Sequence, residues 1–145
     1  MNKICTSIEQ SQKLIELGID VNTADMYWSL VNKNHPPIIG KYCAEYGGMQ
    51  LPAWSLTALS KLIKSEIYGE TIYGDTIIYK VDFRKYKLTD DVDLYQIAYG
   101  NIKFDEDGHD SFKDMINTGQ KEDPVDAAFE MVDWLLLNGY IKKGE

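Results

Sequence analysis

The stretch EDPVDAAFEMVDWLLLNGYI, residues 122–141, is the most strongly patterned part of the sequence. Asp123 followed by Pro124 is a typical helix start. The aspartate accepts a hydrogen bond from an unpaired N–H group, and proline at the first helical position has no N–H to leave unpaired. Asn138-Gly139 is a typical helix end. The pattern therefore predicts a helix over residues 124–138.

An apolar stripe covers more than half the circumference of this helix when residues are placed 100° apart. Burial of the five large aliphatic or Phe side chains in the main part of the stripe would contribute roughly 8–15 kcal/mol before chain entropy is subtracted. We therefore expect the helix to lie at the centre of the core. The stripe consists of Val125, Ala128, Phe129, Val132, Leu135 and Leu136, widened by Ala127, Met131 and Trp134. The strip left for solvent, a candidate partner-binding surface, consists of Asp126, Glu130, Asp133 and Leu137.

Two further helices are predicted before residue 66. Thr6 with Glu9 and Ser7 with Gln10 form overlapping capping-box sequences, which favour a helix over residues 7–17 that Gly18 would end. Around residue 52, Pro52 or Ser55 suits the first turn of a helix, and leucines follow at helical spacing. This second helix is expected over residues 53–65.

Apolar and β-branched runs predict strands in the remaining sequence. We expect them at 26–31, 38–46, 76–83, and 94–104 with a bulge at Gly100-Asn101, together with short strands beside Gly69 and Gly74. Residues 111–117 fit a short helix or a strand equally well. These elements predict an α+β fold: a single domain, residues 1–145, in which the three helices pack on one face of a mostly antiparallel sheet of four or five strands.

Composition excludes a disordered chain, because hydrophobic residues make up 44% and there are three Trp and ten Tyr in 145 residues. Fifteen basic and 23 acidic residues give a net charge of −8, which disfavours nucleic-acid binding. One basic cluster, Lys80, Arg84, Lys85 and Lys87, is followed by three aspartates, Asp90, Asp91 and Asp93. Their charges cancel most of its field, so we expect no nucleic-acid partner.

The sequence predicts a cytoplasmic protein. Its first twelve residues turn polar too early for a signal peptide, and no apolar run approaches the length of about 20 residues that a membrane span needs. The two cysteines, Cys5 and Cys43, fit no paired zinc spacing and are interpreted as reduced and structural.

Motifs for catalysis or cofactor binding are missing from the sequence. There is no G-x-S-x-G elbow, only His35 and His109 could serve as imidazole bases, and Gly47-Gly48 lacks the context of a phosphate loop. We therefore predict no catalytic residue, no cofactor and no metal. One loop, Asp105–Asp110, carries four potential metal ligands. In the twelve-residue pattern of a calcium-binding loop, however, Lys103 would stand at the first ligand position, and Asp114 would replace the bidentate Glu of the twelfth. The loop is interpreted as a turn.

Tyrosines are enriched in the predicted β region between residues 66 and 104. Most are expected to pack within the sheet, although an outward row could form a contact surface. The candidate partner-binding tyrosines are Tyr79, Tyr95 and Tyr99. The same sheet face could also contact a second copy, so a homodimer is possible.

Three stretches together, CTSIEQSQKLIELGIDVNTADMYW (5–28), LPAWSLTALSKLI (51–63) and DPVDAAFEMVDWLLLNGYI (123–141), resemble a family of short, uncharacterised proteins of gut bacteria. Members of that family are often associated with phages and other mobile elements. The resemblance implies a small acidic product that acts by binding, for example to a host protein, or by imitating nucleic acid. It implies no catalytic residue.

Together, these observations favour a non-enzymatic cytosolic protein that binds an unidentified protein partner or has a regulatory role. Two alternatives stay open. One is a small metal-dependent hydrolase that uses the Asp105–Asp110 loop, and the other is an acidic mimic of nucleic acid.

Overall fold

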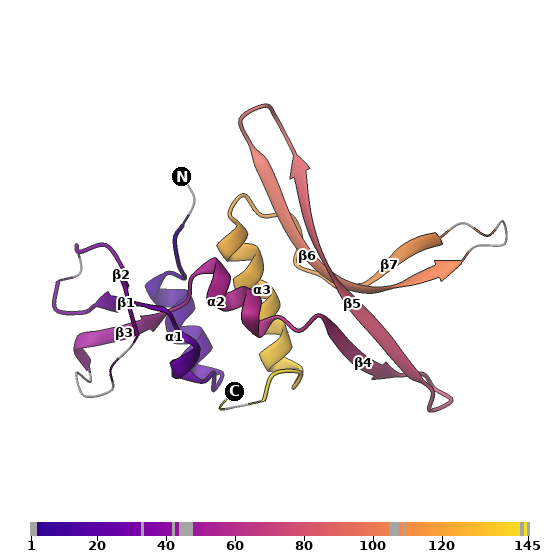
Figure 1. The fold of residues 1–145 in the computed structure, drawn as a ribbon, viewed down its shortest axis with the longest axis horizontal. Coiled ribbons are helices and arrows are strands. Elements are labelled where there is room, and N and C mark those ends of the chain that lie inside the picture. The colour runs from indigo at the N-terminus through magenta and orange to yellow at the C-terminus, as the bar shows by residue number, and fades with distance from the viewer. Residues whose placement is uncertain are drawn as a thin grey trace. The chain divides into compact units, whose positions relative to one another are not determined.

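The computed structural model of the protein describes residues 3–32, 34–41, 43, 48–104, 108, 110–142 and 144, without the side chains of 102–104 and 110–112. The chain forms two compact units (Figure 1). Unit 1 contains Met1–Ile63 and Asp123–Glu145, and unit 2 contains Lys64–Glu122. In the sequence, unit 2 is therefore inserted between two segments of unit 1.

The described residues of unit 1 form three α-helices and a small antiparallel sheet whose strand order is β2-β1-β3. Helix α2 packs against α3, and α1 packs against β3. The elements in chain order are α1 (Ile8–Glu16), a 3-10 helix (Val21–Thr23), β1 (Met26–Ser29), β2 (Ile38–Ile39), β3 (Gln50–Ala53), α2 (Leu56–Leu62) and α3 (Pro124–Leu137).

The first helix uses the second of its two possible capping boxes. Ser7 accepts from the Gln10 backbone, and the Gln10 side chain accepts from the Ser7 backbone. Thr6 cannot serve as the cap because its hydroxyl is buried, contacts Ser11 Oγ at 2.7 Å and accepts from Trp54 N at 3.1 Å. Because the Thr6 hydroxyl is engaged in the core, Ser7 is the N-cap and the helix begins at Ile8.

The second helix is shorter than predicted at both ends. Ser55 is its N-cap and accepts from Ala58 N at 3.2 Å, so the helix begins at Leu56. Pro52 instead lies in β3, opposite Tyr27 of β1. Strand β3 is at the edge of its sheet, where a missing backbone donor is tolerated. Of the two residues that suited the helix start, the structure uses Ser55 and places Pro52 in a strand.

Helix α3 forms as predicted and fills the core of unit 1. Asp123 caps it by accepting from Val125 N at 2.8 Å. Met131, expected at the margin of the apolar stripe, is fully buried, whereas Leu136 is half-buried. The buried residues of the helix are Val125, Ala127, Ala128, Phe129, Met131, Val132 and Leu135.

Unit 2 is an antiparallel sheet with the order β4-β5-β6-β7. Its strands are β4 (Glu66–Glu70), β5 (Thr76–Lys87), β6 (Asp93–Phe104) and β7 (Asp110–Asn117). The first part of β5 pairs with β4 and the rest pairs with β6, while the later part of β6 pairs with β7. This stagger makes the ends of the β4–β5 and β5–β6 hairpins project beyond their neighbouring strands (Figure 1).

Strand β7 settles the assignment of residues 111–117, which are extended. The predicted irregularity near Gly100 is also present, as a register shift between Tyr99 and Gly100. Tyr99 pairs with Ile116 and Gly100 with Asp114, so the extra residue is Met115 on β7. The bulge was predicted on β6, but its extra residue lies on β7, the strand that pairs with β6.

The predicted α+β class is confirmed, since the part of the chain that the structure describes contains three helices and antiparallel strands. The strands form two sheets of three and four strands, in place of the single sheet of four or five that we expected. Strand patterns identify strands but not their partners, and here each strand pairs with neighbours in its own part of the sequence. No helix among the described residues has the length and apolarity to cross a bilayer.

Candidate functional site

The turn between β4 and β5 exposes two large apolar side chains. Ile72 is 93% exposed and Tyr73 is 85% exposed. The turn itself is well ordered by hydrogen bonds: Thr71 N donates to Asp75 O at 2.8 Å, Gly74 N donates to Thr71 O at 3.0 Å, and Asp75 N donates to Thr71 Oγ1 at 3.1 Å. A hydrogen-bonded turn therefore holds Ile72 and Tyr73 in solvent. We call these two residues the hairpin anchor.

The charged residues nearest to the hairpin anchor in the sequence are both acidic. Between residues 67 and 79 the only charged side chains are Glu70 and Asp75, and both are exposed. The first cation after the turn, Lys80, lies opposite Glu66 in the strand register. The apolar pair is therefore flanked by carboxylates.

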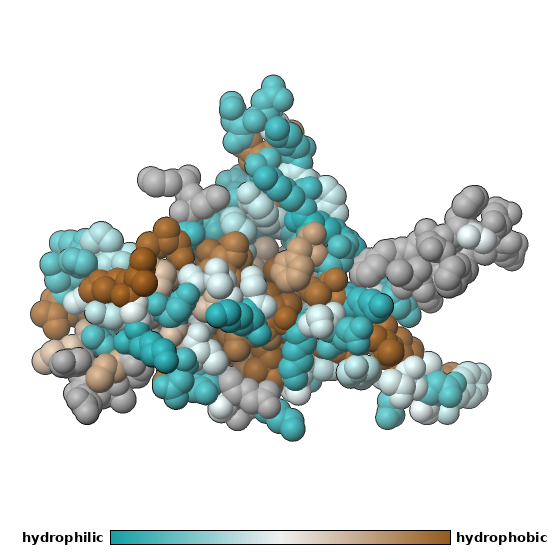
Figure 2. All heavy atoms as spheres, in the orientation of Figure 1, coloured by the Kyte–Doolittle hydropathy of each residue, from teal (hydrophilic) through white to brown (hydrophobic). Residues whose placement is uncertain are grey.

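The turn between β5 and β6 has a similar composition. Leu88 is exposed, and the following residues Asp90 and Asp91 are exposed as well. Leu88 N donates to Val92 O at 2.9 Å, and Val92 N donates to Thr89 Oγ1 at 3.1 Å. The end of this hairpin is mostly hydrophilic at its surface (Figure 2). Leu88 is 61% exposed, less than either residue of the hairpin anchor.

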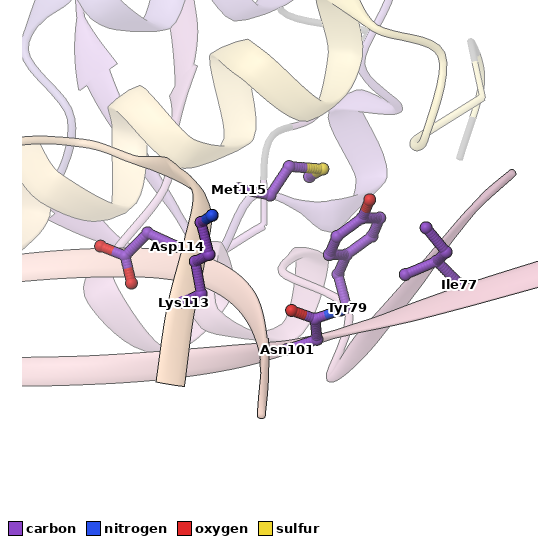
Figure 3. Close-up of a pocket in the computed structure, with 6 residues that line it drawn as sticks. All are labelled: Ile77, Tyr79, Asn101, Lys113, Asp114 and Met115. Carbon is purple, nitrogen blue, oxygen red and sulfur yellow. The ribbon is translucent and has the colours of Figure 1, made fainter. Parts of the chain in front are cut away.

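A shallow pocket of about 190 Å³ lies on the sheet of unit 2 (Figure 3). Its polar groups come from neighbouring strands, since Asn101 of β6 pairs with Lys113 of β7 and Tyr79 comes from β5. The ring of Tyr79 lies over Gly69, where an added Cβ would come within 2.9 Å of Tyr79 Cε2. The pocket is lined by Ile77, Tyr79, Asn101, Lys113, Asp114 and Met115.

A network of charged groups strengthens the sheet beside this pocket. Arg84 of β5 donates to both carboxylate oxygens of Asp114 on β7, at 2.6 and 3.0 Å, and its Nε donates to Asp82 at 2.7 Å. The hydrogen bonds from Arg84 lower the pKa of the Asp114 carboxyl, and those to Asp114 and Asp82 raise the pKa of the Arg84 guanidinium. The carboxylate is thus fully engaged and is no candidate acid or base.

The three candidate tyrosines do not form an outward row. Tyr79 is half-buried at the pocket, and Tyr95 is half-buried with the ammonium of Lys85 5.9 Å from its ring centre. Tyr99 is buried, and its hydroxyl donates to Lys64 O. Burial also raises the pKa of the Tyr99 phenol. Tyr99 therefore serves packing within the chain, and only Tyr79 lines the pocket.

The predicted strip on α3 is partly used inside unit 1. Asp126 accepts from Lys3 Nζ at 2.7 Å and from Gln10 Nε2 at 2.8 Å. Asp133 accepts from Lys13 Nζ at 3.3 Å. These contacts connect α3 to the N-terminal segment and to α1. Glu130, also on the predicted strip, is half-buried, and Leu137 is 62% exposed.

Groups with catalytic potential are scattered. Cys5 is buried, and burial together with the negative Asp25 raises the pKa of its thiol to about 11, far from that of a nucleophile at neutral pH. His35 is exposed, and one ring nitrogen lies 2.7 Å from Pro36 O. Within the described residues no three His, Cys, Asp or Glu side chains gather closely enough to hold a metal. Three of the four potential ligands of the Asp105–Asp110 loop, Asp105, Asp107 and His109, lie outside these residues.

The hairpin anchor was missed in the sequence analysis. A signal for it exists: Ile67–Thr71 reads IYGET and Ile72–Thr76 reads IYGDT, two nearly identical pentapeptides in succession. The first lies in β4 and the turn after it, while the second begins in the turn, where Gly74 adopts a φ of +83° that glycine accepts readily. The positive φ at the second glycine places its Ile and Tyr in the turn.

No protein-family model, curated protein or solved structure matches the chain. Among the surfaces described above, the end of the β4–β5 hairpin combines the highest apolar exposure with a hydrogen-bonded backbone.

Proposed function

We propose that this protein is a non-enzymatic protein-binding module that contacts its partner through the hairpin anchor, Ile72 and Tyr73. The observation that carries the proposal is their exposure of 93% and 85% on an ordered turn. Turns of this kind are usually built from Gly, Asn, Asp, Ser and Pro, which satisfy the backbone without presenting apolar surface to water. Ile and Tyr at this place contribute nothing to the core of the chain.

A contact role explains these side chains energetically. Burying a large aliphatic or aromatic side chain in a partner contributes roughly 1.5–3 kcal/mol, and a few such residues usually dominate the affinity of an interface. The hydrogen bonds from Gly74 and Asp75 to Thr71 order the turn before binding. This order lowers the conformational entropy that association has to remove.

The sheet behind the turn also suits a presenting role. The hairpin β4–β5 shares β5 with the rest of unit 2, and the ion pair of Arg84 with Asp114 fixes β5 to β7. Unit 2 contains eight basic and 13 acidic residues, so it carries −5 of the total charge of −8. A partner with positive surface would therefore be attracted to this unit.

Site-specific photo-crosslinking tests the proposal. A photoreactive phenylalanine analogue at position 73, introduced into the full chain in its native cells, should form a covalent adduct with one protein, identified by mass spectrometry. The same analogue at position 39 is the control, because Ile39 of β2 is also 85% exposed but belongs to unit 1.

The substitution Ile72→Ser should remove the adduct formed at position 73, whereas Ile39→Ser should leave it intact. Both variants exchange the same exposed side chain for the same small polar one, so general effects on solubility are matched. Equal yields of the same adducts from positions 73 and 39 would show that the hairpin end has no specific partner.

A further inference from the structure

We propose that the surface that receives the hairpin anchor is an apolar protein pocket bordered by lysine or arginine side chains. This inference rests on the proposed function and adds the chemistry of the partner. The observation that supports it is the charge beside the anchor. Glu70 and Asp75 flank Ile72 and Tyr73 on both sides of the turn, and they are the only charged side chains between residues 67 and 79.

The positions of the two carboxylates make them border groups of a contact. Glu70 is the last residue of β4 and pairs with Thr76, directly below the turn, and Asp75 immediately precedes Thr76. Both side chains are exposed, and neither makes an ion pair within the described part of the chain. When Ile72 and Tyr73 enter a pocket, these carboxylates come close to its edge. A neutral or acidic edge would desolvate or repel them, whereas cations would compensate for their desolvation.

The same carboxylates disfavour other acceptors. Segments that insert into lipid usually combine apolar residues with Lys or Arg, because the bilayer surface is often anionic. Glu70 and Asp75 have the opposite sign, and they would also repel nucleic-acid phosphates. A second copy of this chain carries a net charge of −8, so self-association through this turn would bring like charges together.

The two parts of the site should affect different rate constants. Charges at the edge of an interface mainly accelerate encounter, and apolar anchors mainly slow dissociation. We expect Glu70→Gln with Asp75→Asn to lower the association rate constant by about threefold to tenfold in low salt and to weaken its salt dependence. Ile72→Ser should raise the dissociation rate constant by about 30-fold, as expected for a central apolar contact.

The experiment uses the protein captured by the photoreactive residue at position 73, purified and immobilised, with the full-length chain as analyte at several salt concentrations. Asp90→Asn with Asp91→Asn is the matched control, since it also removes two exposed carboxylates from a turn of unit 2 but not beside the anchor. This control should change the association rate constant less than the Glu70 and Asp75 pair does. Vesicles of phosphatidylcholine, alone and with phosphatidylglycerol, are tested in parallel.

Each result separates the partner chemistry from the proposed function. If Ile72→Ser accelerates dissociation but the Glu70 and Asp75 variant associates at the wild-type rate at every salt concentration, the basic pocket is excluded and protein binding stands. Capture of this same chain, or vesicle binding that Ile72→Ser abolishes, would also overturn the basic pocket. Absence of any adduct specific to position 73 would refute the proposed function itself.

Discussion

Arg84 on β5 and Asp114 on β7 are joined by two hydrogen bonds that pass over the intervening strand β6. The β6 residue opposite Arg84 is Gln96, whose Oε1 accepts from Arg84 Nη1 at 3.4 Å, and the β6 residue opposite Asp114 is Gly100. The side-chain bridge therefore supplements the backbone ladders of β6 in fixing β5 to β7.

This bridge should stabilise unit 2 measurably. Asp114→Asn removes the charged acceptor of a bidentate pair whose side chains are only 20% and 26% exposed, so we expect a loss of about 1–3 kcal/mol. All three tryptophans lie in unit 1, so Trp fluorescence would not report the change. Amide hydrogen exchange across β5, β6 and β7 is the appropriate measurement.

A double-mutant cycle isolates the pair from its surroundings. Arg84→Met is the second substitution. The sum of the losses in unfolding free energy of the two single variants should exceed the loss of the double variant by about 1 kcal/mol or more. Strictly additive effects would mean that the pair contributes no coupling. Lys85→Met is a control, because Lys85 is exposed and its ion pair with Asp93 is longer, at 3.5 Å.

The same pair should make unit 2 sensitive to acid. The pKa of Asp114 is lowered in the folded state, chiefly by the hydrogen bonds from Arg84. Its contribution to stability is therefore complete above the unfolded pKa of about 4 and is lost as the pH falls through the lower folded value. The protection of β7 amides, measured relative to their intrinsic exchange rates, should fall below about pH 4 in the wild type, and Asp114→Asn should flatten this dependence. An unchanged slope in the variant would assign acid sensitivity to other groups.

The helices could be predicted from sequence because their signals are local. Ser7 with Gln10 and Asp123 with Pro124 each satisfy the free N–H groups of a helix start within a few residues. The choice of Ser55 over Pro52 has a tertiary cause, since only the edge position of β3 makes a strand proline acceptable there. Strand pairing was not predictable for a related reason: the division into two sheets depends on contacts between residues that sequence periodicity does not identify.

The candidate site was predicted less well than the fold. Sequence patterning distinguishes apolar from polar faces, but it cannot tell which polar groups have partners. The helical position of Asp126 predicts a surface acid, yet its carboxylate accepts hydrogen bonds from the side chains of Lys3 and Gln10. Ile72 and Tyr73 read as ordinary strand residues until the turn is seen to place them at its end.

Two residues on α3 should differ sharply in their effect on unit 1. Met131 is fully buried and Leu137 is 62% exposed. We expect Met131→Ala to lower the free energy of unfolding by about 2–5 kcal/mol, because it leaves a cavity in the core. Leu137→Ala should change it by about 0.5 kcal/mol or less. Urea denaturation followed by Trp fluorescence measures both, and similar losses would contradict the assignment of the buried face.

Gly69 should control the pocket on the sheet. A methyl group at this position would come within 2.9 Å of the ring of Tyr79, so Gly69→Ala has to displace that ring. We expect changed NMR signals for Tyr79 and for the neighbouring pocket residues Asn101 and Lys113, with the β4–β5 pairing retained. The same ring signals in wild type and variant would show that Tyr79 does not lie over Gly69.

The buried thiol of Cys5 should make unit 1 less stable at alkaline pH. Its pKa rises from 9.0 to about 11 on folding, because burial and the nearby Asp25 both disfavour the thiolate. A group whose folded pKa is raised stabilises the protein fully below the unfolded pKa and loses that contribution as the pH rises through the folded value. The loss between pH 9 and 11 should be on the order of 2–3 kcal/mol.

Chemical denaturation at pH 8 and pH 10.5 tests this dependence. Cys5→Ala should lose stability less steeply over that interval than the wild type, whereas Cys43→Ala, at a half-buried site, should follow the wild-type curve. Trp54 is a suitable reporter, since it is fully buried and its backbone bonds to Thr6, the residue after Cys5. If Cys5→Ala and Cys43→Ala show the same slope, the alkaline loss does not come from the Cys5 thiol.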